Sequence, residues 1–133
     1  MNIERVFAPI DIAVSGLRAQ GKQMEVISSN IANARTVDAG KGEPYRRLDA
    51  IFKSSEEGIS GVELEQISTD NSEFPKLWDP GNPKAVNGYV SMPNVQLPTE
   101  IMNLTAASRA YQANTAVLKR YQKMVETTLE LLR

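Results

Sequence analysis

Two long segments, one near each end of the chain, carry apolar or small side chains at alternating spacings of three and four residues. The first runs from Pro9 to Ala34 and the second from Thr99 to Arg133. This spacing has a period of about 3.5 residues and places one narrow apolar stripe, the seam of a coiled coil, on each helix. With a rise of 1.5 Å per residue, the two helices would be roughly 39 and 50 Å long. The pattern predicts two long helices that pair as an antiparallel hairpin.

Local signals indicate where these helices begin. Pro9 suits the first position of a helix, because its missing N–H would have no partner there. A proline at this place also argues against one unbroken helix that reaches back to Ile3. Thr99 is the expected N-cap of the second helix, and Glu100 follows in the first turn, where the helix dipole favours an acidic side chain.

Two glycines interrupt the first helical pattern. Gly16 and Gly21 each cost about 1 kcal/mol relative to alanine inside a helix. With the neighbouring Ala13, Ser15 and Ala19, they leave a surface of small side chains. Either another backbone packs closely against this surface, or the two glycines are exposed and merely tolerated.

The residues between the helices change character. Residues 35–44 are rich in turn formers. Alternation of apolar and polar side chains predicts strands over 45–53 and 62–67, and the Asn87-Gly88 pair predicts a hairpin turn before a short strand over 89–92. The expected fold class is mainly α with a small, irregular β region of about three or four short strands. Its three parts are an N-terminal helical segment (1–36), a middle segment of loops and strands (37–98) and a C-terminal helix (99–133).

Composition excludes several classes of function. The 133 residues include no Cys and no His, which excludes thiolate nucleophiles, imidazole bases, zinc fingers and disulfides. A formal net charge of -1 gives no general attraction to nucleic acid. The cluster of Lys119, Arg120 and Lys123 is expected to be the solvated face of a helix. We therefore expect no nucleic-acid partner, no small-molecule substrate, no cofactor and no metal site.

The first residues do not form a cleavable secretion signal, because Glu4, Arg5 and Asp11 interrupt every apolar run. No apolar run approaches the roughly 18 residues that a membrane-spanning helix needs. These features predict a cytoplasmic protein, unless the chain is exported by a route that uses no cleaved signal.

Carboxylates offer the obvious candidates for acid–base catalysis, as the pairs Glu56 with Glu57 and Glu63 with Glu65. A glycosidase-like site needs two carboxyl groups across a cleft, one of them buried. Here the pairs fall in polar turns or on the exposed side of a predicted strand, so we expect them to be solvated and expect no enzyme. A small wall-degrading hydrolase that uses these carboxylates is the catalytic alternative.

A surplus of apolar residues lies off the two seams. A lone helical hairpin buries one stripe per helix, yet six further apolar side chains occupy other positions: Val14, Val26, Met102, Val117, Met124 and Leu131. Either the β region and the helix ends cover them, or helices of other copies or partners do. The second reading makes the chain an assembly protein.

Four ordered motifs resemble those of a known family. The N-terminal motif of bacterial flagellar rod and hook proteins is similar to DIAVSGLRAQGKQMEVISSNIANARTV (11–37) followed by PYRR (44–47). The proximal-rod proteins of that family are similar to DPGNPKAVNGYVSMPNV (79–95) and ASRAYQAN (107–114). The resemblance does not extend over 54–76, and Leu97-Pro98-Thr99 departs from the family's usual apolar-acidic run.

The resemblance implies a structural role. Such proteins stack in a helical tube that crosses the periplasm, transmits torque and encloses the export channel, with the terminal helices as its inner coiled-coil layer. They leave the cell through the flagellar type III export apparatus without a cleaved signal. The implied partners are copies of the chain, the neighbouring proximal and distal rod proteins, and the protein that joins the rod to the membrane ring.

The expected assembly interface consists of seam residues and the polar residues beside them. Asn30 and Asn33 are of particular interest, because their amides offer donors and acceptors that would fix the register against other copies. The alternative for Asn33 is that it helps to end the first helix. The candidates are Leu17, Met24, Ile27, Asn30, Ile31, Asn33, Ala34, Leu104, Ala107, Ser108, Arg109, Tyr111, Asn114 and Leu118.

Two further expectations concern the isolated chain. Seams rich in Ala, Gly, Ser and Asn bury little apolar area, so the helical ends should be partly disordered in a monomer and order on assembly. A free-standing coiled-coil adaptor that binds one partner helix is the alternative that keeps this architecture without a rod.

Overall fold

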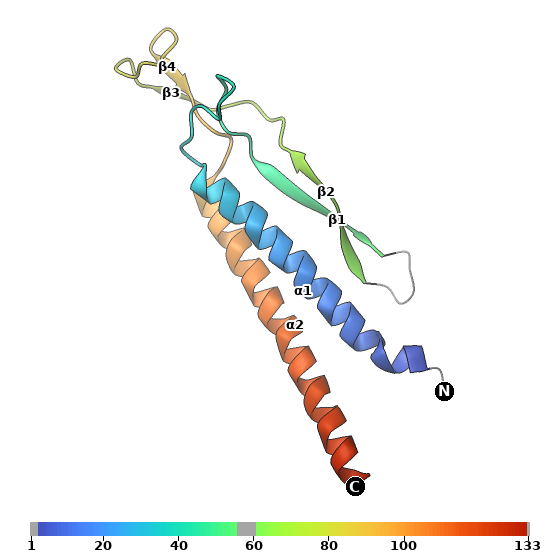
Figure 1. Ribbon diagram of the computed structural model, residues 1–133. Coiled ribbons are helices and arrows are strands. Elements are labelled where there is room, and N and C mark those ends of the chain that lie inside the picture. Colours follow the sequence, from blue (N-terminus) through green and yellow to red (C-terminus); the bar gives the residue numbers. More distant parts are fainter. Residues whose placement is uncertain (1–2, 56–60, 133) are drawn as a thin grey trace.

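Two long antiparallel helices form the body of the molecule (Figure 1). The computed structural model describes residues 3–55 and 61–132, with residues 3–7 described by their backbone only. Helix α1 spans Ile3–Ala32 and helix α2 spans Leu97–Leu131. Between them, β1 (Leu48–Ser54) pairs antiparallel with β2 (Val62–Thr69), and β3 (Lys76–Trp78) pairs antiparallel with β4 (Tyr89–Ser91). The expected fold class, mainly α with a small β region, is confirmed.

The first turns of α1 correct the expectation that this helix begins at Pro9. The helix begins at Ile3 and contains Pro9. Proline removes one backbone hydrogen bond and bends a helix without necessarily ending it. In Figure 1 the first turns accordingly point away from the axis of the rest of α1.

The start of α2 also differs from the prediction, because Thr99 is not its N-cap. The N-cap is Gln96, which makes no side-chain capping bond, and Pro98 lies in the first turn, where a missing N–H has no cost. The hydroxyl of Thr99 instead donates to Gln96 Oε1 at 3.3 Å. Glu100 lies in the first turn as expected.

Helix α1 lies in the middle of a thin, layered structure. Helix α2 packs along one side of α1 and the β1–β2 hairpin along another, so α1 lies between α2 and the two strands (Figure 1). The β3–β4 hairpin lies beyond the end where α1 finishes and α2 starts. The buried apolar side chains are few and mostly small; those of the helices are Ala8, Ala13, Ala19, Val26, Ile27 and Ala107.

Gly16 and Gly21 differ in how closely other residues pack against them. A Cβ atom at Gly16 would lie 2.7 Å from Asn114 Nδ2 on α2, so the absence of a side chain lets the two helices approach. A Cβ atom at Gly21 would meet nothing within 4 Å. The close-packing alternative therefore holds for Gly16, whereas Gly21 has no close neighbour within the single chain.

A β-bulge keeps the apolar side of β2 continuous. Ile51 pairs with Gln66 and Phe52 with Leu64, so Glu65 is the extra residue. Val62 and Leu64 are two residues apart, but the next apolar residue of β2, Ile67, follows after three. The extra residue in the bulge compensates for this odd spacing, so that Leu64 and Ile67 point to the same side of the hairpin. The two strands expected from the alternating pattern are thus present.

The Asn87-Gly88 turn forms as predicted. Both residues have positive φ, 54° and 80°, as the type I′ hairpin turn requires, and Val86 pairs with Tyr89 across it. The main partner of β4 is β3, which the sequence pattern did not predict. A Cβ atom at Gly88 would lie 2.3 Å from the ring of Trp78, so only glycine fits beneath that indole.

Candidate functional site

Asn30 is the centre of a buried joint between α1, β1 and α2. Its side chain is fully buried, and its Nδ2 donates to Leu48 O at 2.8 Å and to Glu100 Oε2 at 3.1 Å. Its Oδ1 accepts from Tyr45 OH at 3.0 Å and from Leu48 N at 2.9 Å. An amide side chain offers two donor hydrogens and two acceptor positions, so all four are used.

Glu100 completes this joint from the first turn of α2. It is fully buried, and its Oε1 accepts from Arg47 Nε at 2.7 Å. Burial lowers the pKa of Arg47, but the hydrogen bond and the charge of Glu100 outweigh that effect and hold this pKa above its usual value. A buried carboxylate with charge-assisted hydrogen bonds at a helix N-terminus is well compensated, so the pair fixes where α2 starts relative to β1.

Asn94 extends the joint to the segment that follows β2. Its Oδ1 accepts from Arg47 N at 2.8 Å, and its Nδ2 donates to Asp70 O at 3.0 Å and to Ser72 Oγ at 2.9 Å. We use the term joint for Asn30, Tyr45, Arg47, Leu48, Asn94 and Glu100 together. Arg47 belongs to the PYRR motif and Glu100 to the expected first turn of the second helix, but neither spacing nor composition indicates that they meet.

The joint gives Asn30 a role within its own chain. Because its amide is satisfied there and has no exposed surface in the single chain, it sets an internal register between α1, β1 and α2. Asn33 also bonds locally: its Nδ2 donates to Ser29 O at 2.9 Å, and its Oδ1 accepts from Thr36 Oγ1 at 3.2 Å. Asn33 directly follows Ala32, the last residue of α1, so these local bonds agree with the alternative that Asn33 helps to end the helix.

The other candidate interface residues fall into three groups by exposure in the single chain. Ile27 and Ala107 are buried, whereas Arg109 and Tyr111 are exposed. The remaining eight are half-buried: Leu17, Met24, Ile31, Ala34, Leu104, Ser108, Asn114 and Leu118. The seam up to Leu118 is thus largely occupied by the contact between α1 and α2.

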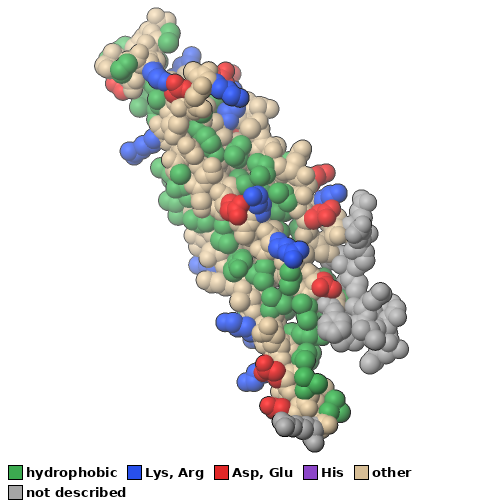
Figure 2. Space-filling view, viewed as in Figure 1, with side chains coloured by type: hydrophobic (Ala, Val, Ile, Leu, Met, Phe, Trp, Pro, Cys, Tyr) green, Lys and Arg blue, Asp and Glu red, His purple; other side chains and the backbone are tan. Residues whose placement is uncertain are grey.

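A second stripe on α2 is left uncovered. Met102, Val117, Met124 and Leu131 have side chains between 48% and 83% exposed. At 100° per residue these four lie on one face of the helix, turned by roughly a quarter circle or more from the buried Ala107. We call these residues the α2 stripe. Hydrophobic side chains remain visible at the surface down to the C-terminal end of α2 (Figure 2).

The six off-seam residues therefore have different fates. Val26 is buried and Val14 half-buried, so for these two the explanation that the fold itself covers them holds. The four residues of the α2 stripe stay between half and largely exposed in the described part of the chain. Another exposed apolar surface, comprising Leu77, Trp78 and Val86, lies on the β3–β4 hairpin.

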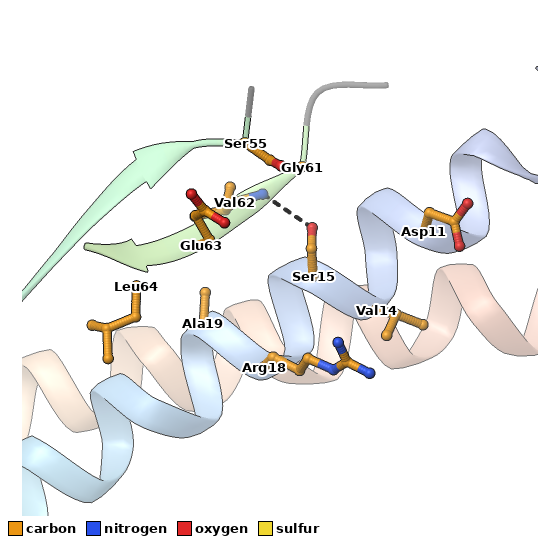
Figure 3. A pocket seen from close by; sticks show the side chains of 10 residues that line it. All are labelled: Asp11, Val14, Ser15, Arg18, Ala19, Ser55, Gly61, Val62, Glu63 and Leu64. Atoms are coloured by element: carbon orange, nitrogen blue, oxygen red, sulfur yellow. Dashed lines mark hydrogen bonds between the residues drawn. The ribbon is translucent and has the colours of Figure 1, made fainter. Parts of the chain in front are cut away.

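An open groove runs between α1 and β2 (Figure 3). Its volume is about 450 Å³. Val14 and Ala19 contribute from α1, and Val62 and Leu64 contribute from β2. The amide of Val62 donates to Ser15 Oγ at 3.1 Å and so ties the end of β2 to the helix. We call this feature the α1–β2 groove.

The candidate catalytic carboxylates do not form a buried pair in the described part of the chain. Glu63 is half exposed and pairs with Lys53 at 3.1 Å, and Glu65 is the exposed bulge residue. Glu56 and Glu57 lie outside the described residues. Among residues 3–55 and 61–132 there is no cluster of three or more acidic side chains able to hold a metal ion, and no helix is long and apolar enough to cross a bilayer.

The turn after α1 is held by Asp38. Its carboxylate accepts from the amides of Gly40 and Gly42 at 2.8 and 3.1 Å and pairs with Lys84. The hydrogen bond from Lys84, followed by those two amides, lowers the pKa of Asp38 to about 2. This pair connects the turn to the β3–β4 region.

Comparison with known proteins identifies the family. Two family descriptions match: "Flagella basal body rod protein" over residues 10–39 and "Flagellar basal body rod FlgEFG protein C-terminal" over 86–131. The flagellar basal-body rod protein FlgC of Agrobacterium fabrum is 40% identical over 127 residues, covering 92% of this chain and 91% of the relative. The chain belongs to the FlgC family of flagellar basal-body rod proteins. FlgC of Salmonella typhimurium is 40% identical over 125 residues (91% and 93% covered), and FlgC of Borreliella burgdorferi is 34% identical over 149 (96% and 98%).

Membership of the FlgC family makes this chain a structural protein of the flagellar basal-body rod. The resemblance seen in the sequence motifs is confirmed. The two matched segments correspond to α1 with the turn after it, and to β4 with α2. They therefore include Asn30, Asn94 and Glu100 of the joint and the whole α2 stripe.

Proposed function

We propose that this chain is a subunit of the proximal part of the flagellar rod. It assembles through its terminal helices, with copies of itself and with the neighbouring proximal and distal rod proteins, into a helical tube. That tube crosses the periplasm, transmits torque and encloses the export channel. The observation that carries the proposal, beside the family, is the α2 stripe, because a solitary soluble chain rarely leaves so long an apolar face exposed.

The division of the chain follows from this role. Residues 1–36 and 99–133 form the inner coiled-coil layer of the tube, and residues 37–98 lie further out. The joint supports this division, since it fixes the middle segment to both helices at one end and leaves the rest of α2 free for neighbours.

The remaining partners are the protein that joins the rod to the membrane ring and the flagellar type III export apparatus. The exposed surface of Leu77, Trp78 and Val86 supports a partner beyond the helix layer, because it lies at the far end from the C-terminus of α2 (Figure 1). The chain reaches the periplasmic rod without cleavage of a signal peptide.

A genetic experiment tests the proposal. In a flagellated strain whose only source of this subunit is the present chain, Val117→Asp combined with Met124→Asp should abolish motility and remove the chain from isolated basal bodies. The matched control, Gln112→Asp, changes an exposed residue on another face of α2 and should leave both intact. Glu63→Gln with Glu65→Gln should also have little effect, contrary to the hydrolase alternative. Full motility with the double aspartate variant, or absence of the unaltered chain from basal bodies, would refute the proposal.

A further inference from the structure

We infer that the α2 stripe of one copy docks into the α1–β2 groove of a second copy. This inference rests on the proposed function and specifies which surfaces meet. The two surfaces are different parts of the same chain, and each is open in the single molecule.

The groove exists because β2 projects beyond α1. Along β1 most side chains are half-buried, whereas β2 is exposed at almost every residue. Val62 and Leu64 are 41% and 37% exposed although both lie beside the helix (Figure 3). The inner side of β2 and the adjacent edge of α1 therefore present apolar surface that one helix is too narrow to cover.

The length of the groove matches a short piece of helix. Its α1 lining runs from Asp11 to Ala19, which corresponds to roughly 12 Å along the helix axis. Val117 and Met124 on the stripe are seven residues apart, or roughly 10 Å. This is one heptad, so both side chains face the same partner, and the flexible Met124 can adapt to an irregular groove.

Charge disfavours the alternative pairing, in which the stripes of two copies pack on each other. Asp11 and Glu63 lie at the margins of the groove, with Arg18 its one lining cation and Glu63 partly satisfied by Lys53. Beside the stripe, Arg120 and Lys123 are exposed and have no ion pair with any described residue. Docking brings Arg120 toward Asp11, whereas two stripes packed on each other would bring four cations together.

Contact between two different surfaces has a consequence for symmetry. A heterologous contact does not close on itself as a two-fold dimer does, and it repeats from copy to copy as an open helix or a ring. Such a contact suits a subunit of a tube.

Cysteine cross-linking tests the contact directly, because the chain contains no Cys. Two variants, one with Leu64→Cys and the other with Val117→Cys, are produced together in a strain that makes no unaltered copy of this subunit. The isolated basal bodies are then oxidised. We expect a mixed disulfide dimer. Replacing Val117→Cys with Gln112→Cys should lower the yield about ten-fold, because a disulfide needs Cβ atoms within about 4.5 Å.

A charge exchange gives an independent result. Arg120→Glu should reduce the amount of chain in basal bodies about ten-fold, since like charges face each other across the contact. Adding Asp11→Arg to the same chain should restore it. Three outcomes in basal bodies that contain the chain would overturn this contact and leave the proposed function standing. They are failure of Asp11→Arg to restore assembly, equal cross-linking through Gln112→Cys, and disulfide dimers formed only between two copies of the Val117→Cys variant. Absence of the unaltered chain from basal bodies would instead overturn the proposed function.

Discussion

Replacing Asn30 by leucine is the most informative perturbation of this fold. Leucine has a similar shape but cannot donate or accept hydrogen bonds. The substitution leaves Leu48 N, Leu48 O and one oxygen of Glu100 without the partner that each has now, while Tyr45 OH keeps its contact with Ser29 at 3.2 Å. At about 1–3 kcal/mol for each unpaired buried group, and toward the lower figure because Leu48 is only half-buried, the free energy of unfolding should fall by about 3 kcal/mol.

Urea unfolding of the purified chain, followed by far-UV circular dichroism, measures this loss. With a slope of about 1–3 kcal/mol per molar urea, the midpoint should fall by about 1–3 M. Asn33→Leu is the matched control, because it removes the same amide three residues away but breaks only local bonds at the helix end. Its cost should stay below about 1 kcal/mol. Equal effects of the two substitutions would refute the assignment of Asn30 as the centre of the joint.

Three further predictions concern the helices and the turn after α1. Gly21→Ala should raise the free energy of unfolding by about 0.5–1 kcal/mol, whereas Gly16→Leu should lower it by about 1–3 kcal/mol through overpacking; thermal unfolding measures both, and equal shifts would contradict the packing described. Carboxyl NMR of Asp38 should show a titration midpoint near 2, which Lys84→Gln moves toward 3.8. Because the folded pKa is the lower one, this pair stabilises the fold above about pH 4 and its contribution is lost as the pH falls toward 2. In amide hydrogen exchange of dilute monomer, residues next to the joint should be protected and residues 117–131 should not; uniform strong protection along α2 would show that assembly is not needed to order it.

The charged residues of the joint illustrate how a rod subunit can combine a fixed shape with an open surface. Arg47 and Glu100 form an ion pair within the chain, so the first turn of α2 has a defined position relative to β1. From Val117 onward nearly every α2 side chain is exposed. The chain is thus firmly held at one end, and under the proposed assembly neighbouring subunits would cover the other.

Patterns that repeat along the chain are sufficient to determine the two helices and two of the strands. A heptad spacing specifies a helix with one apolar stripe because side-chain direction depends only on local backbone geometry. The Asn87-Gly88 turn is equally local, since positive φ at both residues favours these residue types. The same applies to the four residues of the α2 stripe, whose position off the main seam follows from their spacing.

Tertiary structure alone decided which residues meet across long sequence separations. Asn30 and Glu100 are seventy residues apart, and no period connects them. Gly16 and Gly21 are the same residue type in the same helix, but only Gly16 faces another side chain closely. Lys76–Trp78 is a strand because it pairs with β4, since no pattern within these three residues predicts one. Local propensity fixes the conformation of each segment, whereas burial and pairing depend on which segments the folded chain brings together.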